Sequence, residues 1–239
     1  MSEKLFIVIP AYNEAENIRA VIESWSKYLI LLTGGGGVLA VDDGSKDDTF
    51  RIIQDCAKNN PSIIPLTKKN GGHGSAVLFG YNYAISHGAD YVFQTDSDGQ
   101  TLPEEFPAFW ELRREYDAVL GCRPDRKDGL SRKFVEKVLC VILRIIFGVR
   151  VPDANCPFRL MKAEILRKYL PRIPENFNIP NVILTAYFAY FKERITFREI
   201  TFRPRQGGKN SINIMKITAI GLRAVKDFLR FRRDMKNAK

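Results

Sequence analysis

The stretch LFIVIPAYNE, residues 5–14, joins a run of apolar side chains to a short polar segment. VLAVDDGSKDDT (38–49) and YVFQTDSDGQT (91–101) repeat this pattern, an apolar run that ends abruptly in polar residues. Short apolar runs bounded by turn residues are typical of buried β-strands. The three segments therefore predict strands that each end in a polar loop.

The rest of the first half alternates between strand-like and helix-like segments. The sequence predicts strands at 5–10, 38–43, 63–67, 91–96 and 118–121, separated by amphipathic segments that predict helices at 14–32, 47–59, 74–87 and 103–115. Such alternation is typical of an α/β fold with a mostly parallel sheet flanked by helices, in which ligands bind at the carboxyl ends of the strands. The polar segments lie at those ends.

Composition and cysteine content favour a folded, reduced protein. Of the 239 residues, 45% are apolar and 27% are charged, which is ordinary for a folded domain and excludes a largely disordered chain. The four cysteines show no C-x-x-C spacing, and the first apolar run is too short for the core of a signal peptide. No uninterrupted apolar stretch reaches the ~18–20 residues of a transmembrane helix. We expect a cytoplasmic protein.

The positive charge of the chain is concentrated at its carboxy-terminal end. Residues 201–239 contain eleven of the lysines and arginines against only Asp227 and Asp234, in a chain of net charge +10. Within this part, 214–235 predicts a helix with an apolar face opposite a basic one. Contact with an anionic membrane surface is one interpretation, and a helix docked on the protein with a solvated basic face is the other. Nucleic acid is disfavoured, because few aromatic residues are arranged for base stacking.

A second amphipathic segment, 133–149, leaves two interpretations open. At helical spacing its charged residues fall on one narrow stripe and the rest of its surface is apolar; they are Lys133, Glu136, Lys137 and Arg144. The segment is either a helix buried against the domain or one that lies in the membrane interface.

Two of the polar segments suggest nucleotide and phosphate binding. Asp42 and Asp43 follow the second strand, and a nucleotide ring N–H or a ribose hydroxyl would suit one of these carboxylates. Ser45 or Asp47 could cap the following helix. NGGHGSA (70–76) is a glycine-rich turn that opens a helix, where backbone N–H groups could approach a diphosphate. His73 is interpreted as a turn residue rather than a catalyst.

The segment DSDGQ, 96–100, places two carboxylates and an amide on alternate residues. Neighbouring carboxylates repel one another unless a cation lies between them. A polar loop is one interpretation and a metal or phosphate site is the other. The position directly after a strand favours the metal site, because oxygen ligands with substrate phosphates suit Mg²⁺ or Mn²⁺.

Together these motifs, in this order, resemble family 2 glycosyltransferases of the GT-A fold. The resemblance covers residues 4–212 and is strongest to dolichyl- and polyprenyl-phosphate hexosyltransferases. It implies a divalent metal, Mg²⁺ or Mn²⁺, held by Asp96, Asp98 and Gln100, with Asp98 also counted as catalytic. It also implies a pocket for a nucleoside-diphosphate sugar lined by Pro10, Tyr12, Glu14, Asp42, Asp43, Gly74 and Asp96. We accordingly expect a GT-A domain over 1–212 and a membrane-contacting amphipathic helix over 213–239.

The second half of the resemblance concerns the acceptor. The sequence has no Glu-Asp pair, the element that supplies the catalytic carboxylate in family members acting on hydroxyl acceptors. DANCPFRLMK (153–162) and RPRQGGKNS (203–211) instead resemble elements of the lipid-phosphate branch, with Cys156-Pro157 and Lys209 as departures. An ionised acceptor phosphate needs cations rather than a base, and arginine binds phosphate bidentately. The residues implied are Arg123 and Arg132, both also counted as catalytic, together with Arg205 and Ser211.

The leading functional hypothesis is an inverting transferase that moves a hexose from GDP-mannose or UDP-glucose, or a related donor, to a polyprenyl phosphate. It would act peripherally at the cytoplasmic face of a membrane, and the need for an integral membrane partner stays open. One alternative keeps the donor site but transfers the sugar to a glycan or a lipid-linked saccharide. Another is a membrane-surface binding module without catalysis.

Overall fold

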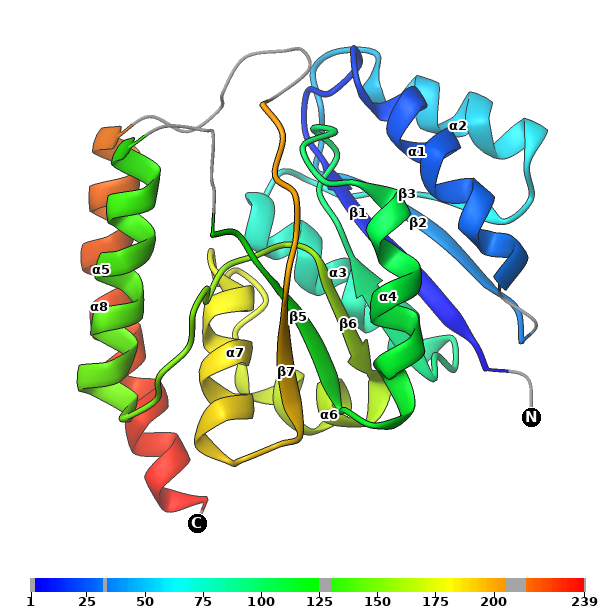
Figure 1. The fold of residues 1–239 in the computed structure, drawn as a ribbon. Helices are drawn as coiled ribbons and strands as arrows, with labels where there is room; N and C mark the ends of the chain where they lie inside the picture. The colour runs from blue at the N-terminus through cyan, green and yellow to red at the C-terminus, as the bar shows by residue number, and fades with distance from the viewer. Residues whose placement is uncertain (1–2, 32–33, 125–129, 205–213, 239) are drawn as a thin grey trace.

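The computed structural model describes residues 3–31, 34–124, 130–204 and 214–238. One seven-stranded sheet, in the order β3-β2-β1-β4-β6-β5-β7, runs through the protein (Figure 1). Its strands are β1 Leu5–Ala11, β2 Gly36–Asp42, β3 Ile63–Thr67, β4 Tyr91–Gln94, β5 Ala118–Cys122, β6 Arg159–Lys162 and β7 Ile195–Glu199. The pairings are parallel except for the two made by β6, which is antiparallel to both β4 and β5. The expected mostly parallel α/β sheet is confirmed.

Helices cover both faces of the sheet (Figure 1). The α-helices are α1 Ile18–Ser26, α2 Thr49–Asn59, α3 His73–Ser86, α4 Phe106–Glu111, α5 Leu130–Phe147, α6 Ala163–Tyr169, α7 Pro180–Tyr190 and α8 Ile214–Asn237. Short 3₁₀ turns are η1 Lys27–Leu31, η2 Pro103–Glu105, η3 Leu112–Arg114 and η4 Leu170–Arg172.

Alternation along the buried strands divides the core into two layers. On β1, Phe6 and Val8 pack into the layer of α3, α5, α6 and α7, whereas Ile7 and Ile9 pack into the layer of α1, α2 and α4. Successive side chains of a strand point to opposite faces, so a strand covered on both faces is apolar throughout. This accounts for the uninterrupted apolar run in β1.

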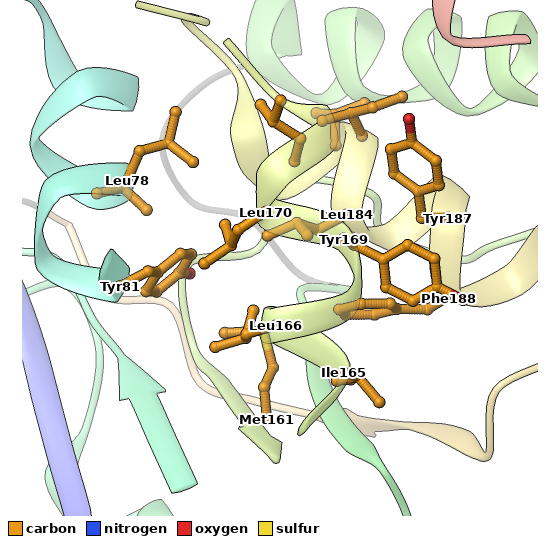
Figure 2. Close-up of a cluster of buried hydrophobic side chains, with 14 of the residues drawn as sticks. Leu78, Tyr81, Met161, Ile165, Leu166, Tyr169, Leu170, Leu184, Tyr187 and Phe188 are labelled. Carbon is orange, nitrogen blue, oxygen red and sulfur yellow. The ribbon is translucent and has the colours of Figure 1, made fainter. Parts of the chain in front are cut away.

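The layer on the α3 side is built largely from the second half of the chain. In Figure 2, Leu78 and Tyr81 of α3 lie opposite Met161 of β6 and Leu166 of α6. Tyr169 stacks on Tyr187 of α7 with ring centroids 5.1 Å apart. Elements that are distant in sequence thus share one core.

The predicted strands are all present, within two residues at every end. The predicted helix 14–32 is shorter than expected, because α1 begins only at Ile18 and residues 12–17 form a loop over the strand ends. The segment 103–115 is divided between η2, α4 and η3. We predicted no element for β6, α6, α7 or β7. β6 has only four residues, too few for alternation to be distinctive, and α7 is buried almost throughout, so it shows no polar stripe.

Helices α5 and α8 lie side by side, and α5 also contacts α7 (Figure 1). Phe228 of α8 contacts Phe147 of α5 with ring centroids 5.7 Å apart, and Phe231 contacts Phe177 and Tyr187. Helical spacing puts Leu229 on the same apolar face, but its side chain is 58% exposed. The aromatic face of the described part of α8 is therefore docked on the protein. No helix among the described residues is both long and apolar enough to span a bilayer.

Candidate active site

The loops that follow β1, β2 and β4, together with the glycine-rich turn before α3, meet at the carboxyl ends of the parallel strands. We call this region the strand-end site. Its first two loops are joined by reciprocal hydrogen bonds, since Asn13 N–H donates to Ser45 Oγ (2.9 Å) and Lys46 N–H donates to Asn13 Oδ1 (2.8 Å). Asn13 has a left-handed backbone (φ 54°), which Asn tolerates better than most residues. These hydrogen bonds therefore join the two loops on one side of the strand-end site.

The predicted donor residues of the first loop are placed differently from one another. Pro10 is a buried member of β1, paired in register with Val41 of β2, whereas Tyr12 is half-buried beyond the strand end. Glu14 is only 8% exposed, and its Oε2 accepts a hydrogen bond from Asn17 Nδ2 at 2.9 Å. Its backbone N–H donates to Thr49 Oγ1 at 2.8 Å. Glu14 thus fixes the loop that carries Tyr12.

Asp42 and Asp43 are both buried at the end of β2, and each is engaged with the protein. Asp42 accepts hydrogen bonds from Ser45 N–H (3.2 Å) and Thr67 Oγ1 (3.0 Å). Asp43 accepts from Gly71 N–H (3.0 Å) and Gly72 N–H (2.7 Å), and it also binds Lys68 Nζ. In this structure the Asp43 carboxylate holds the glycine-rich turn in place.

The glycine-rich turn packs tightly against the loop that precedes α7. A Cβ atom on Gly74 would lie 2.2 Å from the backbone oxygen of Phe177 and 2.5 Å from that of Asn178. Only glycine allows this approach of two backbones. The glycine at 74 is required by packing, whatever it contributes to a bound donor.

The DSDGQ loop after β4 contains a carboxylate oxygen that lacks a hydrogen-bond partner. Asp96 Oδ1 is buried and accepts no hydrogen bond from any residue that the structure describes, and it lies 3.8 Å from His73 Nε2. Asp98 Oδ1 accepts the N–H of Gln100 at 3.1 Å. Buried carboxylate oxygens are normally paired, so this atom fits a ligand that the chain itself does not supply. A divalent cation is such a ligand.

The third predicted metal ligand, Gln100, is buried, and the nitrogen of its side-chain amide is already hydrogen-bonded. Its Nε2 donates to the backbone oxygen of Arg203 (2.8 Å), and Arg203 N–H donates back to Gln100 O. Within the described ranges, no three carboxylate, imidazole or thiol groups lie close enough to enclose a metal ion. An ion at Asp96 would therefore complete its coordination with phosphate oxygens, as Mg²⁺ commonly does.

Arg123, one of the predicted acceptor residues, lies in a buried cluster with Asp153 and Glu136. We call these three residues the Arg123 cluster. Arg123 Nε and Nη2 bind Asp153 at 2.7 and 3.0 Å, and Nη2 lies 3.6 Å from Glu136 Oε2. The guanidinium also lies over the Phe202 ring, 5.1 Å from its centroid. The ion pair with Asp153 is buried, not a salt bridge on the surface.

The charges of the Arg123 cluster are strongly coupled. Burial raises the pKa of Glu136 to about 7, and the Asp153 carboxylate adds to the rise. Burial alone would also raise the pKa of Asp153, but hydrogen bonds from Arg123 hold it below its usual value. The two carboxyl groups are hydrogen-bonded to each other, so the proton resides on Glu136. Glu136 belongs to the charged stripe of 133–149, and its side chain turns inward to Arg123.

The remaining predicted acceptor residues cannot be compared with the structure. Arg132 is in α5, but its side chain lies outside the described residues. Arg205 and Ser211 lie outside the described residues altogether.

A buried polar network beneath the strand-end site was not predicted from the sequence. Tyr81 of α3 donates to Gln94 Oε1 at the end of β4, and burial raises the pKa of Tyr81 far above its usual value. Arg159 of β6 donates to the backbone oxygens of Cys156 and Asn181 at 2.8 to 3.1 Å. The sequence signal is weak, since a lone polar residue in a short apolar strand becomes notable only when its neighbours are known.

Comparison with solved structures identifies the fold. Glucosyl-3-phosphoglycerate synthase from Mycobacterium tuberculosis, in complex with phosphoglyceric acid, matches with a TM-score of 0.67 at 22% identity, over 96% of this chain and 80% of that one. Its complex with Mn²⁺, UDP and phosphoglyceric acid matches with a TM-score of 0.70 at 19% identity, over 96% and 78% of the two chains. At this identity the likeness establishes the architecture, which is a GT-A α/β fold.

Sequence comparison identifies the family. The model of Glycosyl transferase family 2 matches residues 6–170. Undecaprenyl-phosphate 4-deoxy-4-formamido-L-arabinose transferase of Yersinia pestis (strain Pestoides F) is 30% identical over 219 residues, 90% of this chain, and its Yersinia enterocolitica serotype O:8 counterpart is 31% identical. The chain spans 64% of the length of these relatives. It belongs to glycosyl transferase family 2.

Proposed function

We propose that this protein transfers a hexose from a nucleoside-diphosphate sugar to a polyprenyl phosphate, with a divalent cation at Asp96. The observation that carries the proposal is the buried, unpartnered Oδ1 of Asp96 at the meeting point of three strand-end loops. The related Yersinia enzymes, named as undecaprenyl-phosphate sugar transferases, support the acceptor class. The alternative acceptor, a glycan or lipid-linked saccharide, is an outcome that the test below distinguishes.

In the proposed reaction the strand-end site binds the donor. Tyr12 lies where a base could pack, and the first turn of α3 presents backbone N–H groups toward a diphosphate. A divalent cation held by Asp96, and by Asp98 and Gln100 where they reach it, would neutralise charge on the departing nucleoside diphosphate. Asp42, Asp43 and Glu14 hold the loops that shape this pocket.

The acceptor phosphate supplies the nucleophile. One of its oxygens forms a bond to the anomeric carbon as the bond from that carbon to the diphosphate oxygen breaks, which inverts the configuration. The phosphate is already ionised, so no general base is needed. Arginines position it and balance its charge, and we assign this role to Arg123, Arg132 and Arg205, with Ser211 as a hydrogen-bond donor.

A lipid acceptor requires contact with a membrane, and the paired helices α5 and α8 offer a suitable surface. Among their described side chains, the exposed large apolar ones are Val138, Val141, Ile145 and Leu229. Exposed basic residues accompany them, namely Lys137, Arg144, Lys226, Arg230 and Arg233. Apolar side chains among basic ones suit an anionic membrane surface.

A transfer assay tests the proposal. The purified protein is incubated with Mn²⁺ or Mg²⁺, labelled UDP- and GDP-sugars, and undecaprenyl or dolichyl phosphate. We expect label to enter the organic phase with at least one donor. Label that passes only to a water-soluble glycan would assign the alternative acceptor, and donor binding without transfer to either acceptor would remove the acceptor half of the proposal.

A further inference from the structure

His73 and Asp96 face each other across the strand-end site at a distance that does not suit a hydrogen bond. His73 Nε2 lies 3.8 Å from Asp96 Oδ1, beyond the 2.7–3.2 Å of an N–H···O bond. Asp96 Oδ1 is buried and has no hydrogen-bond partner. Across the part of the chain that the structure describes, Asp96 is the one charged group paired with the His73 ring. The two atoms are thus close to each other without a direct hydrogen bond between them.

The separation suits two ligands of one metal ion. Ligand atoms at about 2.1 Å from an ion lie about 3 Å apart at a right angle and about 4 Å apart on opposite sides. The observed 3.8 Å falls within this range. We propose that His73 is a further ligand of the divalent cation that binds the donor diphosphate, opposite Asp96. The inference rests on the proposed function and adds one residue to its metal site.

The backbone that carries His73 is held from two sides. Asp43 binds the N–H groups of Gly71 and Gly72 just before it, and Gly74 just after it packs on the backbone of Phe177 and Asn178. His73 is the first residue of α3, whose positive end attracts the diphosphate. The imidazole is therefore presented from a fixed position at the place where ion and phosphates would meet.

An imidazole ligand would also change which metal the site prefers. Carboxylate and phosphate oxygens suit Mg²⁺ and Mn²⁺ alike, but imidazole nitrogen favours the transition metal, Mn²⁺. The site of this chain should therefore select Mn²⁺ over Mg²⁺ more strongly than a site built from oxygen ligands alone.

The chain contains only two histidines, and both lie on or beside α3, which provides a matched control. His87 follows the last residue of α3 and stacks on Tyr83 with ring centroids 3.8 Å apart. Wild-type protein, His73→Ala and His87→Ala are each loaded with Mn²⁺ and either UDP or GDP. Pulsed electron paramagnetic resonance then detects any ¹⁴N nucleus bound to the Mn²⁺, and titration gives the affinity for Mn²⁺ in the presence of nucleotide.

We expect a directly bound ¹⁴N in the wild type and in His87→Ala, and its loss in His73→Ala. Affinity for Mn²⁺ should fall about 10-fold or more in His73→Ala, with a smaller fall for Mg²⁺. Nucleotide nitrogens are excluded as the source if the signal disappears in His73→Ala, since the nucleotide is unchanged. His73→Gln should also lack the signal, and thermal unfolding shows that each variant is folded.

Mn²⁺ that binds with nucleotide but shows no ¹⁴N coupling in the wild type would overturn the inference and leave the proposed donor site intact. If the wild type lacks the ¹⁴N signal but His73→Ala reduces nucleotide affinity, His73 contacts the diphosphate and not the metal ion. Failure of the wild type to bind Mn²⁺ with any nucleoside diphosphate would overturn the proposed function as well.

Discussion

The strand-end site and the Arg123 cluster both bury charged side chains, but they balance them differently. Asp96 Oδ1 has no hydrogen-bond partner among the described residues, whereas Arg123 is paired with Asp153 and lies close to Glu136. A buried polar atom without a partner reduces the stability of the fold unless a ligand binds it. The first region therefore has a buried oxygen that a ligand would satisfy, whereas the charged groups of the second are paired with one another.

This difference affects how each region could act on a substrate. The strand-end site has an atom available for an ion. At the Arg123 cluster an acceptor phosphate would have to share a guanidinium that already binds a carboxylate. Because the pKa of Glu136 is raised to about 7, its carboxyl group is partly protonated near neutral pH. Arg123 is therefore less strongly neutralised than two fully ionised carboxylates would make it. Five predictions test this contrast, from the largest effect to the smallest.

Asp96→Asn should separate activity from stability. Transfer should fall about 1,000-fold, because charge stabilisation by a bound cation contributes several kcal/mol to the transition state. Thermal unfolding should stay unchanged or shift upward, since an unpartnered buried charge is removed. Asp55→Asn, at a surface ion pair with Lys58 on α2, is the control and should leave both properties intact. A marked loss of stability in Asp96→Asn would contradict the idea of an unbalanced charge.

Arg123→Ala should affect stability as well as activity. Removing one partner of a buried ion pair leaves uncompensated charge, which costs about 3–5 kcal/mol. Chemical denaturation measures this loss. Arg194→Ala is the control, because Arg194 binds Asp117 at an exposed position and should cost a small fraction of that. Equal stability of the two variants would show that the Arg123 cluster is not the balanced unit described above.

Gly74→Ala tests the contact where the glycine-rich turn meets the second half of the chain. A methyl group 2.2 Å from Phe177 O forces the two backbones apart, and we expect a loss of about 2–3 kcal/mol in the free energy of unfolding. Gly88→Ala, with open space but a φ of 76°, should cost about 1 kcal/mol. Similar losses in both variants would argue against a close contact at Gly74.

Glu136 should make stability depend on pH. Its pKa is raised in the fold, so between pH 4.5 and about 7 the folded state retains a proton that the unfolded state has released. Stability therefore falls as pH rises through this window, by on the order of 2 kcal/mol. In Glu136→Gln this fall should disappear, since the amide does not titrate and can still donate to Asp153. Denaturation curves from pH 4 to 8 measure it, and an unchanged slope in the variant would assign the fall to another group.

Ile145→Ser should weaken membrane contact without affecting the fold. Ile145 is 76% exposed on α5, so the substitution removes apolar surface that only a partner would cover. Loss of one buried aliphatic side chain corresponds to about 1–2 kcal/mol, or about 5- to 30-fold weaker binding to anionic liposomes in a flotation assay. Phe79→Ser, at an exposed position of α3, is the control. Equal binding by the two variants would show that helices α5 and α8 do not form the membrane-contacting surface.

Much of the first half of the fold could be predicted because its signals are local. The strands β1, β2 and β4 each show an apolar run and a polar ending within about ten residues. Parallel pairing then brings the three endings together. The inward side chain of Glu136 and the exposure of Leu229 were not predicted for the opposite reason. Helical periodicity separates polar from apolar faces but does not show which face meets the protein. Glu136 turns inward because Arg123, thirteen residues away, supplies its counter-charge.

The sequence by itself determined the family, the mostly parallel sheet and the group of polar residues at its strand ends, because each depends on neighbouring residues. Only the tertiary structure decided which charged groups are paired within the protein. Asp43 binds Gly71, 28 residues later, and Arg123 binds an aspartate 30 residues away, whereas Asp96 Oδ1 has no hydrogen-bond donor among the described residues. Whether a carboxylate is satisfied depends on every donor that folding brings within about 3 Å, and sequence spacing does not encode that distance.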